Sequence, residues 1–82
     1  NIKLYPNPVN DKFTISFIVE TQTKVELKLY DISGKLIKTT DIGMYNNGQH
    51  NVNSDISFLN SGVYLLEVNL NERSQKYKLV KK

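Results

Sequence analysis

The segment "KVELKLY" at residues 24–30 decides the fold class. Apolar side chains occupy every second position, at Val25, Leu27 and Leu29, and charged side chains lie between them. A period of two is expected of a strand with one face buried and the other in water. The next four residues, "DISG" at 31–34, place Asp first and Gly last, as in a type I turn. With "KLIKTTDI" at 35–42 they predict a β-hairpin over residues 24–42.

The same alternation recurs on both sides of this hairpin. "IKLY" at 2–5 predicts a short strand that stops at "PNP", because proline cannot donate to a ladder. "KFTISFI" at 12–18 buries Phe13, Ile15 and Phe17. "VYLLEVNL" at 63–70 and "QKYKLVK" at 75–81, joined by the turn "NERS", predict a second hairpin over 62–81. Its inward side chains are expected to be Tyr64, Leu66, Val68, Leu70, Tyr77 and Leu79.

The segment between the hairpins has a weaker pattern. "GMYNNGQ" at 43–49 is predicted as a loop, since its Gly and Asn residues tolerate positive φ. A short strand is expected near residues 49–53, followed by a turn that carries Leu59 inward. About seven strands with frequent turn signals, and no helical periodicity, predict an all-β fold. The expected architecture is an immunoglobulin-like antiparallel β-sandwich, without the Cys–Trp–Cys core of antibody domains.

Length and composition limit the possible functions. Eighty-two residues make a single domain, 1–82, with a modest core. No apolar run approaches the roughly 20 residues of a membrane helix, so no membrane insertion is expected. The absence of cysteine removes disulfides, thiolate metal sites and cysteine nucleophiles. Because the chain begins at Asn1 and not at an initiator Met, we expect it to be a fragment of a longer protein, so its N-terminus gives no information on export.

The positive charge of the chain is concentrated at one end. Residues 1–72 hold six basic and eight acidic side chains, whereas residues 73–82 hold five basic and none acidic. A nucleic-acid-binding protein more often spreads basic residues over a docking face and mixes them with aromatics. We therefore predict no nucleic-acid partner.

No catalytic group is visible in the sequence. His50 is the only histidine and follows a polar stretch, so it is expected to be an ordinary surface or strand-edge residue. The carboxylates are dispersed, and no nucleophile elbow or phosphate loop occurs. We expect no enzyme activity, no cofactor and no metal site. A weak calcium site at "NPVND" (7–11) or "NSD" (53–55) stays open.

Exposed tyrosines support an alternative from another class of function. Tyr30 lies at a predicted strand end and Tyr45 in a predicted loop beside Asn46 and Asn47. Such residues can bind glycans, so the chain can also be interpreted as a small carbohydrate-binding or spacer module of a secreted hydrolase.

Four stretches, taken together, carry a family resemblance. "LYPNP" at 4–8, "LYDISGKLI" at 29–37, "ISFLNSGVYLLEV" at 56–68 and "KYKLVKK" at 76–82 occur in this order. The chain resembles the type A C-terminal sorting domain of the type IX (Por) secretion system of Bacteroidota. That resemblance covers essentially the whole chain. It implies an immunoglobulin-like fold and a secretion signal that directs an N-terminal cargo across the outer membrane.

The resemblance also implies partners and a route. The domain would pass through the periplasm and be recognised by the outer-membrane translocon and a shuttle receptor. A surface sortase would then remove it, leaving the cargo at the cell surface or secreted. Three motifs match the family. They are the N-terminal motif Pro6, Asn7 and Pro8; the hairpin turn Asp31, Gly34 and Lys35; and the translocon-recognition set Gly62, Tyr64, Leu66, Lys78, Leu79, Val80, Lys81 and Lys82.

The basic tail has two explanations from its residues. Lysines on an edge strand discourage pairing with other chains, which is part of the expected role of Lys76 and Lys78. In the functional interpretation, Tyr77 and Leu79 dock the strand, and residues 80–82 project as an ordered end for a receptor. Lysines would then steer the encounter, and apolar contacts would set its lifetime. Deletion of residues 78–82 is expected to block export while leaving most of the fold intact.

Overall fold

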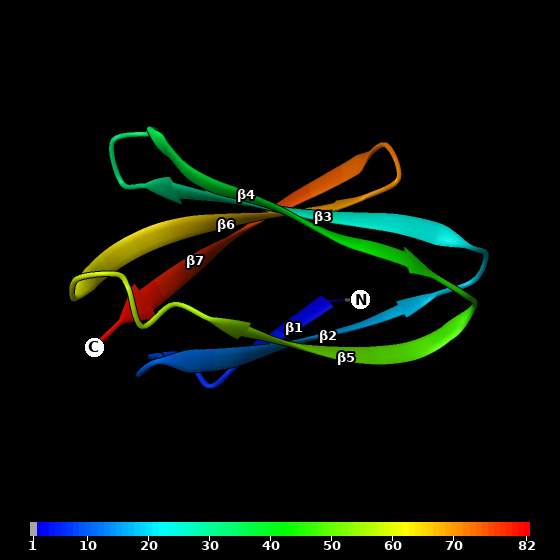
Figure 1. Cartoon of the computed structure of the whole chain (residues 1–82), viewed down its shortest axis with the longest axis horizontal. Coiled ribbons are helices and arrows are strands. Elements are labelled where there is room, and N and C mark those ends of the chain that lie inside the picture. The colour runs from blue at the N-terminus through cyan, green and yellow to red at the C-terminus, as the bar shows by residue number, and fades with distance from the viewer. Residues whose placement is uncertain (1) are drawn as a thin grey trace.

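The chain folds into seven β-strands. A computed structural model describes residues 2–82, and Figure 1 shows them as two layers of antiparallel strands with no helix. No segment of these residues is therefore a helix of the kind that crosses a membrane. The strands are β1 (Ile2–Tyr5), β2 (Lys12–Val19), β3 (Thr23–Asp31), β4 (Leu36–Tyr45), β5 (Gly48–Asp55), β6 (Gly62–Leu70) and β7 (Arg73–Lys81).

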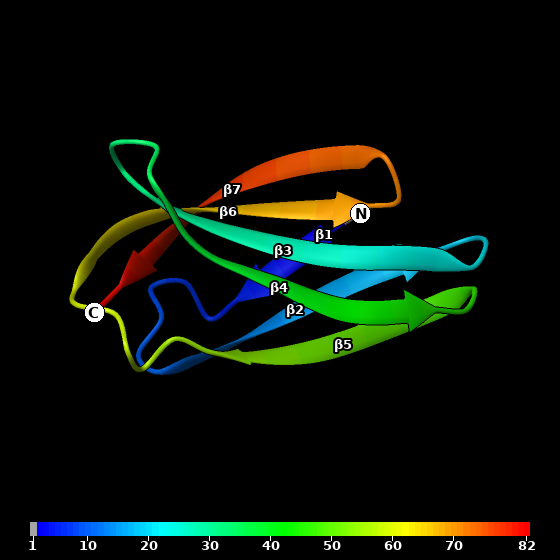
Figure 2. The same cartoon turned by 45° about the horizontal axis from the view of Figure 1, so that its top comes forward.

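Two sheets make up the sandwich. One contains three strands in the order β1-β2-β5, and the other contains four in the order β4-β3-β6-β7. Figures 1 and 2 show the sheets facing each other, with β1 and β7 along one side and β4 and β5 along the other. This arrangement confirms the predicted all-β, immunoglobulin-like sandwich.

The core lies between the sheets, on the faces that the alternation predicted. Phe13, Ile15 and Phe17 from β2 face Val25, Leu27 and Leu29 from β3, and all six are buried. On the second hairpin, Leu66, Val68 and Leu79 are buried, and Tyr64, Leu70 and Tyr77 pack against the same cluster. Each of these strands therefore has its period-2 face directed inward.

Both predicted hairpins are present. In the first, the N–H of Gly34 donates to the carbonyl of Asp31 at 3.0 Å, which closes the four-residue turn. Gly34 has a φ of 93°, a left-handed conformation that a side chain disfavours. In the second, Asn71 and Glu72 alone separate β6 from β7. Asn71, with a φ of 56°, also exchanges two hydrogen bonds with the backbone of Lys24.

The prediction for residues 43–49 was wrong. β4 continues to Tyr45 and β5 begins at Gly48, so only residues 46 and 47 lie between the strands. β5 also extends to Asp55 rather than ending near residue 53. Its polar side chains disfavour a strand, but its backbone pairs with β2 along the whole of β5, from Gly48 to Asp55. Tertiary pairing thus overrides local propensity here. Leu59 packs against the core as expected, and Ile56, which the sequence did not single out, is buried.

Candidate functional site

The β6–β7 hairpin divides the predicted recognition residues between two faces. The pairing aligns Gly62 with Lys81, Tyr64 with Leu79, and Leu65 with Lys78. Tyr64, Leu66, Leu79 and Lys81 therefore point into the sandwich. Lys78 and Val80 point outward, and Lys82 is exposed. The structure brings these residues together on one hairpin, but about half of them lie where a partner cannot touch them directly.

The N-terminal motif meets the C-terminal strand through Asn7. The side-chain N–H of Asn7 donates to the carbonyl of Lys78 at 3.0 Å, and its Oδ1 accepts the backbone N–H of Val80 at 3.0 Å. An amide side chain carries one acceptor and two donors, so it can take the place of a peptide group in a ladder. The side chain of Asn7 thereby makes the pair of hydrogen bonds that a backbone residue of a neighbouring strand would make. The flanking Pro6 and Pro8 are exposed.

Val9 continues the same edge with its backbone. Its N–H donates to the carbonyl of Val80 at 2.7 Å, and its carbonyl accepts the N–H of Lys82 at 2.8 Å. Val9 forms a parallel bridge with Lys81, and its side chain is fully buried. Residues 78–82 are therefore held on both sides, by β6 and by residues 7–9. We call this set of contacts from Asn7 and Val9 the N-terminal clamp.

Lys81 does not project from the fold, which corrects the expectation for residues 80–82. Only 8% of its side chain is exposed, and its Nζ lies 3.8 Å from Oδ1 of Asp11. The same Nζ donates to the carbonyl oxygen of Lys82 at 3.1 Å. The alternation of β7 sets this orientation, because Lys81 follows Tyr77 and Leu79 on the inner face. The positive charge at position 81 is thus partly withdrawn from solvent at the end of the sandwich.

The hairpin-turn motif lies at the same end of the four-stranded sheet. Asp31 pairs with Tyr64, two residues from Gly62, and Gly62 pairs with Lys81. Oδ1 of Asp31 accepts the N–H and hydroxyl of Ser33 and the N–H of Lys35, at 2.9, 2.6 and 3.0 Å. These hydrogen bonds, first that of the Ser33 side chain, hold the pKa of Asp31 below its usual value. All three sequence motifs therefore converge on one end of the domain.

Tyr64 holds the loop that precedes β6. Its hydroxyl donates to the carbonyl of Asn60 at 2.7 Å, which ties the loop before β6 to the strand. A side chain at Gly62 would meet the ring of Tyr64 at 3.8 Å, an ordinary contact distance. These contacts support a structural role for Tyr64.

The tyrosines of the carbohydrate-binding alternative do not share a surface. Tyr45 is half-buried and packs edge-to-face on Phe17, with ring centroids 5.2 Å apart, and also against His50. Tyr30 lies on the outer face, near the opposite end of β3, where it pairs with Leu36; Tyr45 pairs with Thr23. The expectation of an exposed aromatic at position 45 was wrong, because β4 extends to that residue and turns it toward the core.

His50 lies within β5, beside this aromatic pair. Its ring centroid is 5.6 Å from that of Phe17 and 4.9 Å from that of Tyr45. Its Nε2 is 2.6 Å from the carbonyl oxygen of Asn46. The histidine is thus a packed strand residue, in agreement with the edge assignment made from the sequence.

The two stretches considered for calcium engage their oxygen atoms internally. Oδ1 of Asn7 accepts from Val80, Oδ1 of Asn53 accepts from Thr14, and Oδ1 of Asp55 accepts the N–H of Ser57. Within residues 2–82, no three His, Cys, Asp or Glu side chains gather as metal ligands would.

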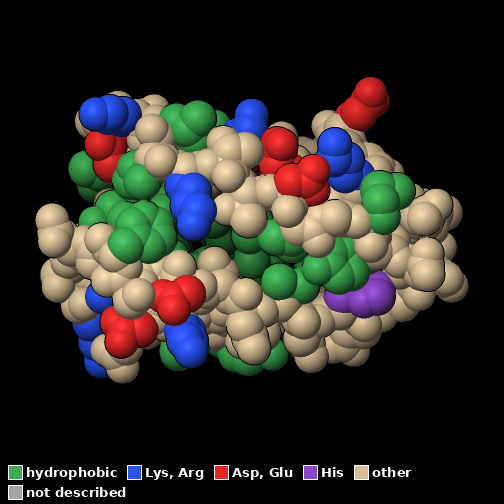
Figure 3. Space-filling model, viewed as in Figure 1, with side chains coloured by type: hydrophobic (Ala, Val, Ile, Leu, Met, Phe, Trp, Pro, Cys, Tyr) green, Lys and Arg blue, Asp and Glu red, His purple; other side chains and the backbone are tan. Residues whose placement is uncertain are grey.

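A hollow opens between the edges of β4 and β5, where Lys38 lies 5.2 Å from the ring centroid of Phe58 (Figure 3).

The fold and these contacts define a small β-sandwich whose two terminal segments are bonded to each other and whose motifs meet at one end. The family model described as "Secretion system C-terminal sorting domain" matches residues 3–82. The chain therefore belongs to this family, the C-terminal sorting domains of type IX secretion. A search of the curated proteins found no match.

Family membership gives the function in coarse form. A domain of this kind is a sorting signal rather than a catalyst, and it works with the type IX machinery and an N-terminal cargo. The protein that carries it is exported to the cell surface or secreted.

Two sets of residues at this end were not predicted as functional from the sequence. Val9 supplies both backbone contacts of the N-terminal clamp, and a lone valine after "PNP" gave no signal for that. Val63 and Leu65 lie on the outer face of β6. The sequence did contain a signal for Val63 and Leu65. A half-buried strand should carry polar residues at every second position, but "VYLL" at 63–66 is apolar at every position.

Proposed function

We propose that this domain directs its cargo through the type IX translocon by presenting the β6–β7 hairpin as the recognised surface. The observation that carries the proposal is the N-terminal clamp, which bonds the edge of residues 78–82 that β6 leaves free. A terminal strand with one free edge would fray, whereas this one is held in a single register. A receptor would then meet a preformed surface and lose less entropy on binding.

The predicted recognition residues take two roles in this proposal. Lys78, Val80 and Lys82 face solvent and contact the translocon or its shuttle receptor. Tyr64, Leu66, Leu79 and Lys81 point inward and act through the hairpin geometry that they maintain, and Gly62 starts β6 beside them. The N-terminal and turn motifs position the same end of the sheet.

The proposed route follows the family. The cargo enters the periplasm by its own signal peptide, and the folded domain is recognised there and passes the outer membrane with the cargo. A surface sortase then removes the domain. The cargo is left anchored to anionic lipopolysaccharide or released.

The test is a fusion of a periplasmic signal peptide and a fluorescent protein to residues 1–82. It is expressed in a host with a working type IX system and in a translocon-deficient mutant. We expect fluorescence outside the cell only in the working host. If the fusion stays in the periplasm of both hosts, and a version with more upstream sequence does so too, the proposal fails.

Deletion of residues 78–82 is not the sharp test that the sequence suggested. It removes Leu79, which is fully buried, and the partners of Asn7 and Val9. Loss of export would then report unfolding as readily as loss of recognition. Substitutions of outward-facing residues separate the two effects.

A further inference from the structure

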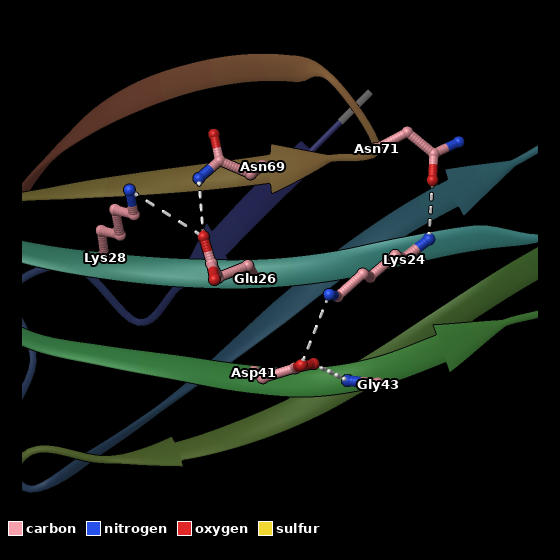
Figure 4. A network of polar contacts seen from close by, with 7 residues as sticks. All are labelled: Lys24, Glu26, Lys28, Asp41, Gly43, Asn69 and Asn71. Atoms are coloured by element: carbon pink, nitrogen blue, oxygen red, sulfur yellow. Dashed lines mark hydrogen bonds and ion pairs between the residues drawn. The ribbon is translucent and has the colours of Figure 1, made fainter.

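The outer face of the four-stranded sheet has two unlike halves. The half near the β6–β7 turn is polar and its groups bond to one another, as Figure 4 shows. Lys24 lies 3.8 Å from Asp41, and Lys28 lies 4.0 Å from Glu26. Asn69 donates to Glu26 at 3.5 Å. This half has the character of an ordinary solvated sheet face.

The other half, at the end where the motifs meet, is apolar. The backbone pairing aligns Leu36, Tyr30 and Leu65 across three strands, and Val63 with Val80 across two. Tyr30, Leu65 and Val80 each adjoin a buried residue of the same strand and so lie on the outer face. Leu36 and Val63 share that face because they pair with Tyr30 and Val80. We call Tyr30, Leu36, Val63, Leu65 and Val80 the outer patch. Leu36 is 47% exposed, and Ile32, in the adjacent turn, is 75% exposed.

Basic side chains border the outer patch. Lys78 pairs with Leu65, and Lys76 lies one row further, with its Nζ 5.7 Å from the ring centroid of Tyr30. Lys35 and Lys82 are exposed beside it. Within residues 2–82, ion pairs involve Lys24, Lys28 and Lys81, so none of these four bordering lysines is neutralised in that way. At the upper left of Figure 3, where the β3–β4 turn lies, hydrophobic and basic atoms lie together with an acidic side chain.

Two acids, Asp31 and Glu67, lie near these four lysines and offset only part of their charge. The carboxylate of Asp31 is turned into its own turn, where it accepts three hydrogen bonds. Glu67 pairs across the strands with Lys76 and Lys28, and it accepts the hydroxyl of Tyr30 at 3.4 Å. The field at the border of the outer patch is therefore positive.

We propose that the outer patch docks on a protein of the type IX machinery whose contact surface is apolar at the centre and carries carboxylates around it. The inference rests on the proposed function and names the surface and the chemistry of its partner. An apolar patch bordered by polar groups is typical of a protein interface. Burial of the five side chains would supply affinity, and the lysines would set orientation and encounter rate.

The shape of the outer patch favours a protein over an anionic lipid surface. Its side chains stand on the four paired strands β4, β3, β6 and β7, so their arrangement is preformed by the sheet. A lipid surface is more often entered by the apolar face of an amphipathic helix, and residues 2–82 contain no helix. A preformed face on a paired sheet matches a complementary protein surface, since both can pack without large rearrangement.

The test uses the full fusion in the type IX host, with matched variants. Leu65→Glu places a carboxylate at the centre of the outer patch. Ile18→Glu is its control, because Ile18 is an exposed apolar residue on the outer face of the other sheet. Lys76→Glu with Lys78→Glu reverses the border charge, and Lys3→Glu with Lys12→Glu makes the same change on the three-stranded sheet. Thermal unfolding of each purified domain verifies folding.

We expect Leu65→Glu and the Lys76/Lys78 pair to lower exported fluorescence at least tenfold, while both controls export as the parent fusion does. Export of the folded variants at the parent level would overturn the inference and leave the proposed function standing. Failure of the parent fusion itself would instead remove the proposed function. If Leu65→Glu unfolds, Val63→Thr, which keeps the shape of valine, replaces it and is expected to lower export severalfold.

A binding measurement separates the protein partner from a lipid. The purified domain is mixed with phosphatidylglycerol vesicles and with neutral phosphatidylcholine vesicles. We expect no binding to either that depends on the outer patch. Binding to the anionic vesicles that Leu65→Glu abolishes would overturn the proposal in favour of a lipid surface.

Discussion

Val80 donates its backbone N–H to Oδ1 of Asn7, a residue 73 positions earlier, at 3.0 Å. The side-chain N–H of Asn7 also donates to the carbonyl of Lys78. The one side chain of Asn7 therefore bonds two backbone groups on the edge of β7 that faces away from β6. Without Asn7, that stretch of β7 would be an open edge. The relationship links the N-terminal motif to the strand that we propose the translocon recognises.

Asn7→Ala should therefore loosen the end of β7. It removes two hydrogen bonds at an exposed edge, and water can replace them, so the expected loss of stability is about 1–2 kcal/mol. Urea unfolding measures this loss. Amide hydrogen exchange should show a larger local effect, with faster exchange at Val80 and Lys82 than in the middle of β6.

Asn10→Ala is the matched control, because Asn10 is exposed and lies outside the N-terminal clamp. Its stability and exchange should stay at the parent values. Unchanged exchange at Val80 in Asn7→Ala would show that β6 and Val9 hold the strand without Asn7.

Lys81→Met should be neutral or stabilise the fold by up to about 1 kcal/mol. The lysine loses most of its hydration, and its one acidic neighbour, Asp11, lies at 3.8 Å and is itself exposed. Such a pair seldom repays the cost of burying the charge, and methionine has a similar length. Thermal unfolding at pH 7 measures the change, with the exposed Lys82→Met as control. A loss of more than about 2 kcal/mol would mean that the contacts of Nζ with Asp11 and with the carbonyl of Lys82 contribute net stability.

The hairpins could be predicted from the sequence because local signals agreed there. At Val25, Leu27 and Leu29 the period of two coincides with burial, and Asp31 and Gly34 supply the turn chemistry. Residues 43–55 failed because their strands depend on partners far along the chain. Nothing local distinguishes His50 or Asn53 from loop residues, and only the pairing with β2 makes them strand.

The candidate site was predictable to a similar extent. The structure gathers the predicted motif residues at one end of the domain, but which of them face inward was misjudged at Lys81, since a lysine after Leu79 suggested solvent rather than the inner face. The outer patch could have been predicted, because residues 63, 65 and 80 are apolar at positions where the alternation of a half-buried strand calls for polar residues. The N-terminal clamp was not, because no local pattern indicates that an asparagine side chain will serve as a rung between the two termini.

Leu79→Ala should remove a large share of the stability of the domain. Leu79 is fully buried between the sheets, and truncation of such a residue costs about 2–5 kcal/mol. Small domains have about 5–15 kcal/mol in total, so a measurable unfolded fraction is expected at 37 °C. Leu79→Met conserves volume and should cost less than about 1.5 kcal/mol. Equal unfolding midpoints for the two variants in urea would show that the site relaxes to fill the space.

Acid should destabilise the first hairpin through Asp31. The hydrogen bonds from Ser33 and Lys35 favour the carboxylate, so the pKa of Asp31 in the folded domain lies below its usual value of 3.8. A depressed pKa contributes stability above the unfolded value, and that contribution is lost as pH falls from about 4 through the folded pKa. Asp31→Asn cannot titrate, so its thermal midpoint should fall less steeply between pH 5 and pH 2 than that of the parent. Asp55, whose pKa is also lowered, by Ser57, should account for part of the remaining slope. Identical slopes for parent and variant would contradict the assignment of this pH dependence to Asp31.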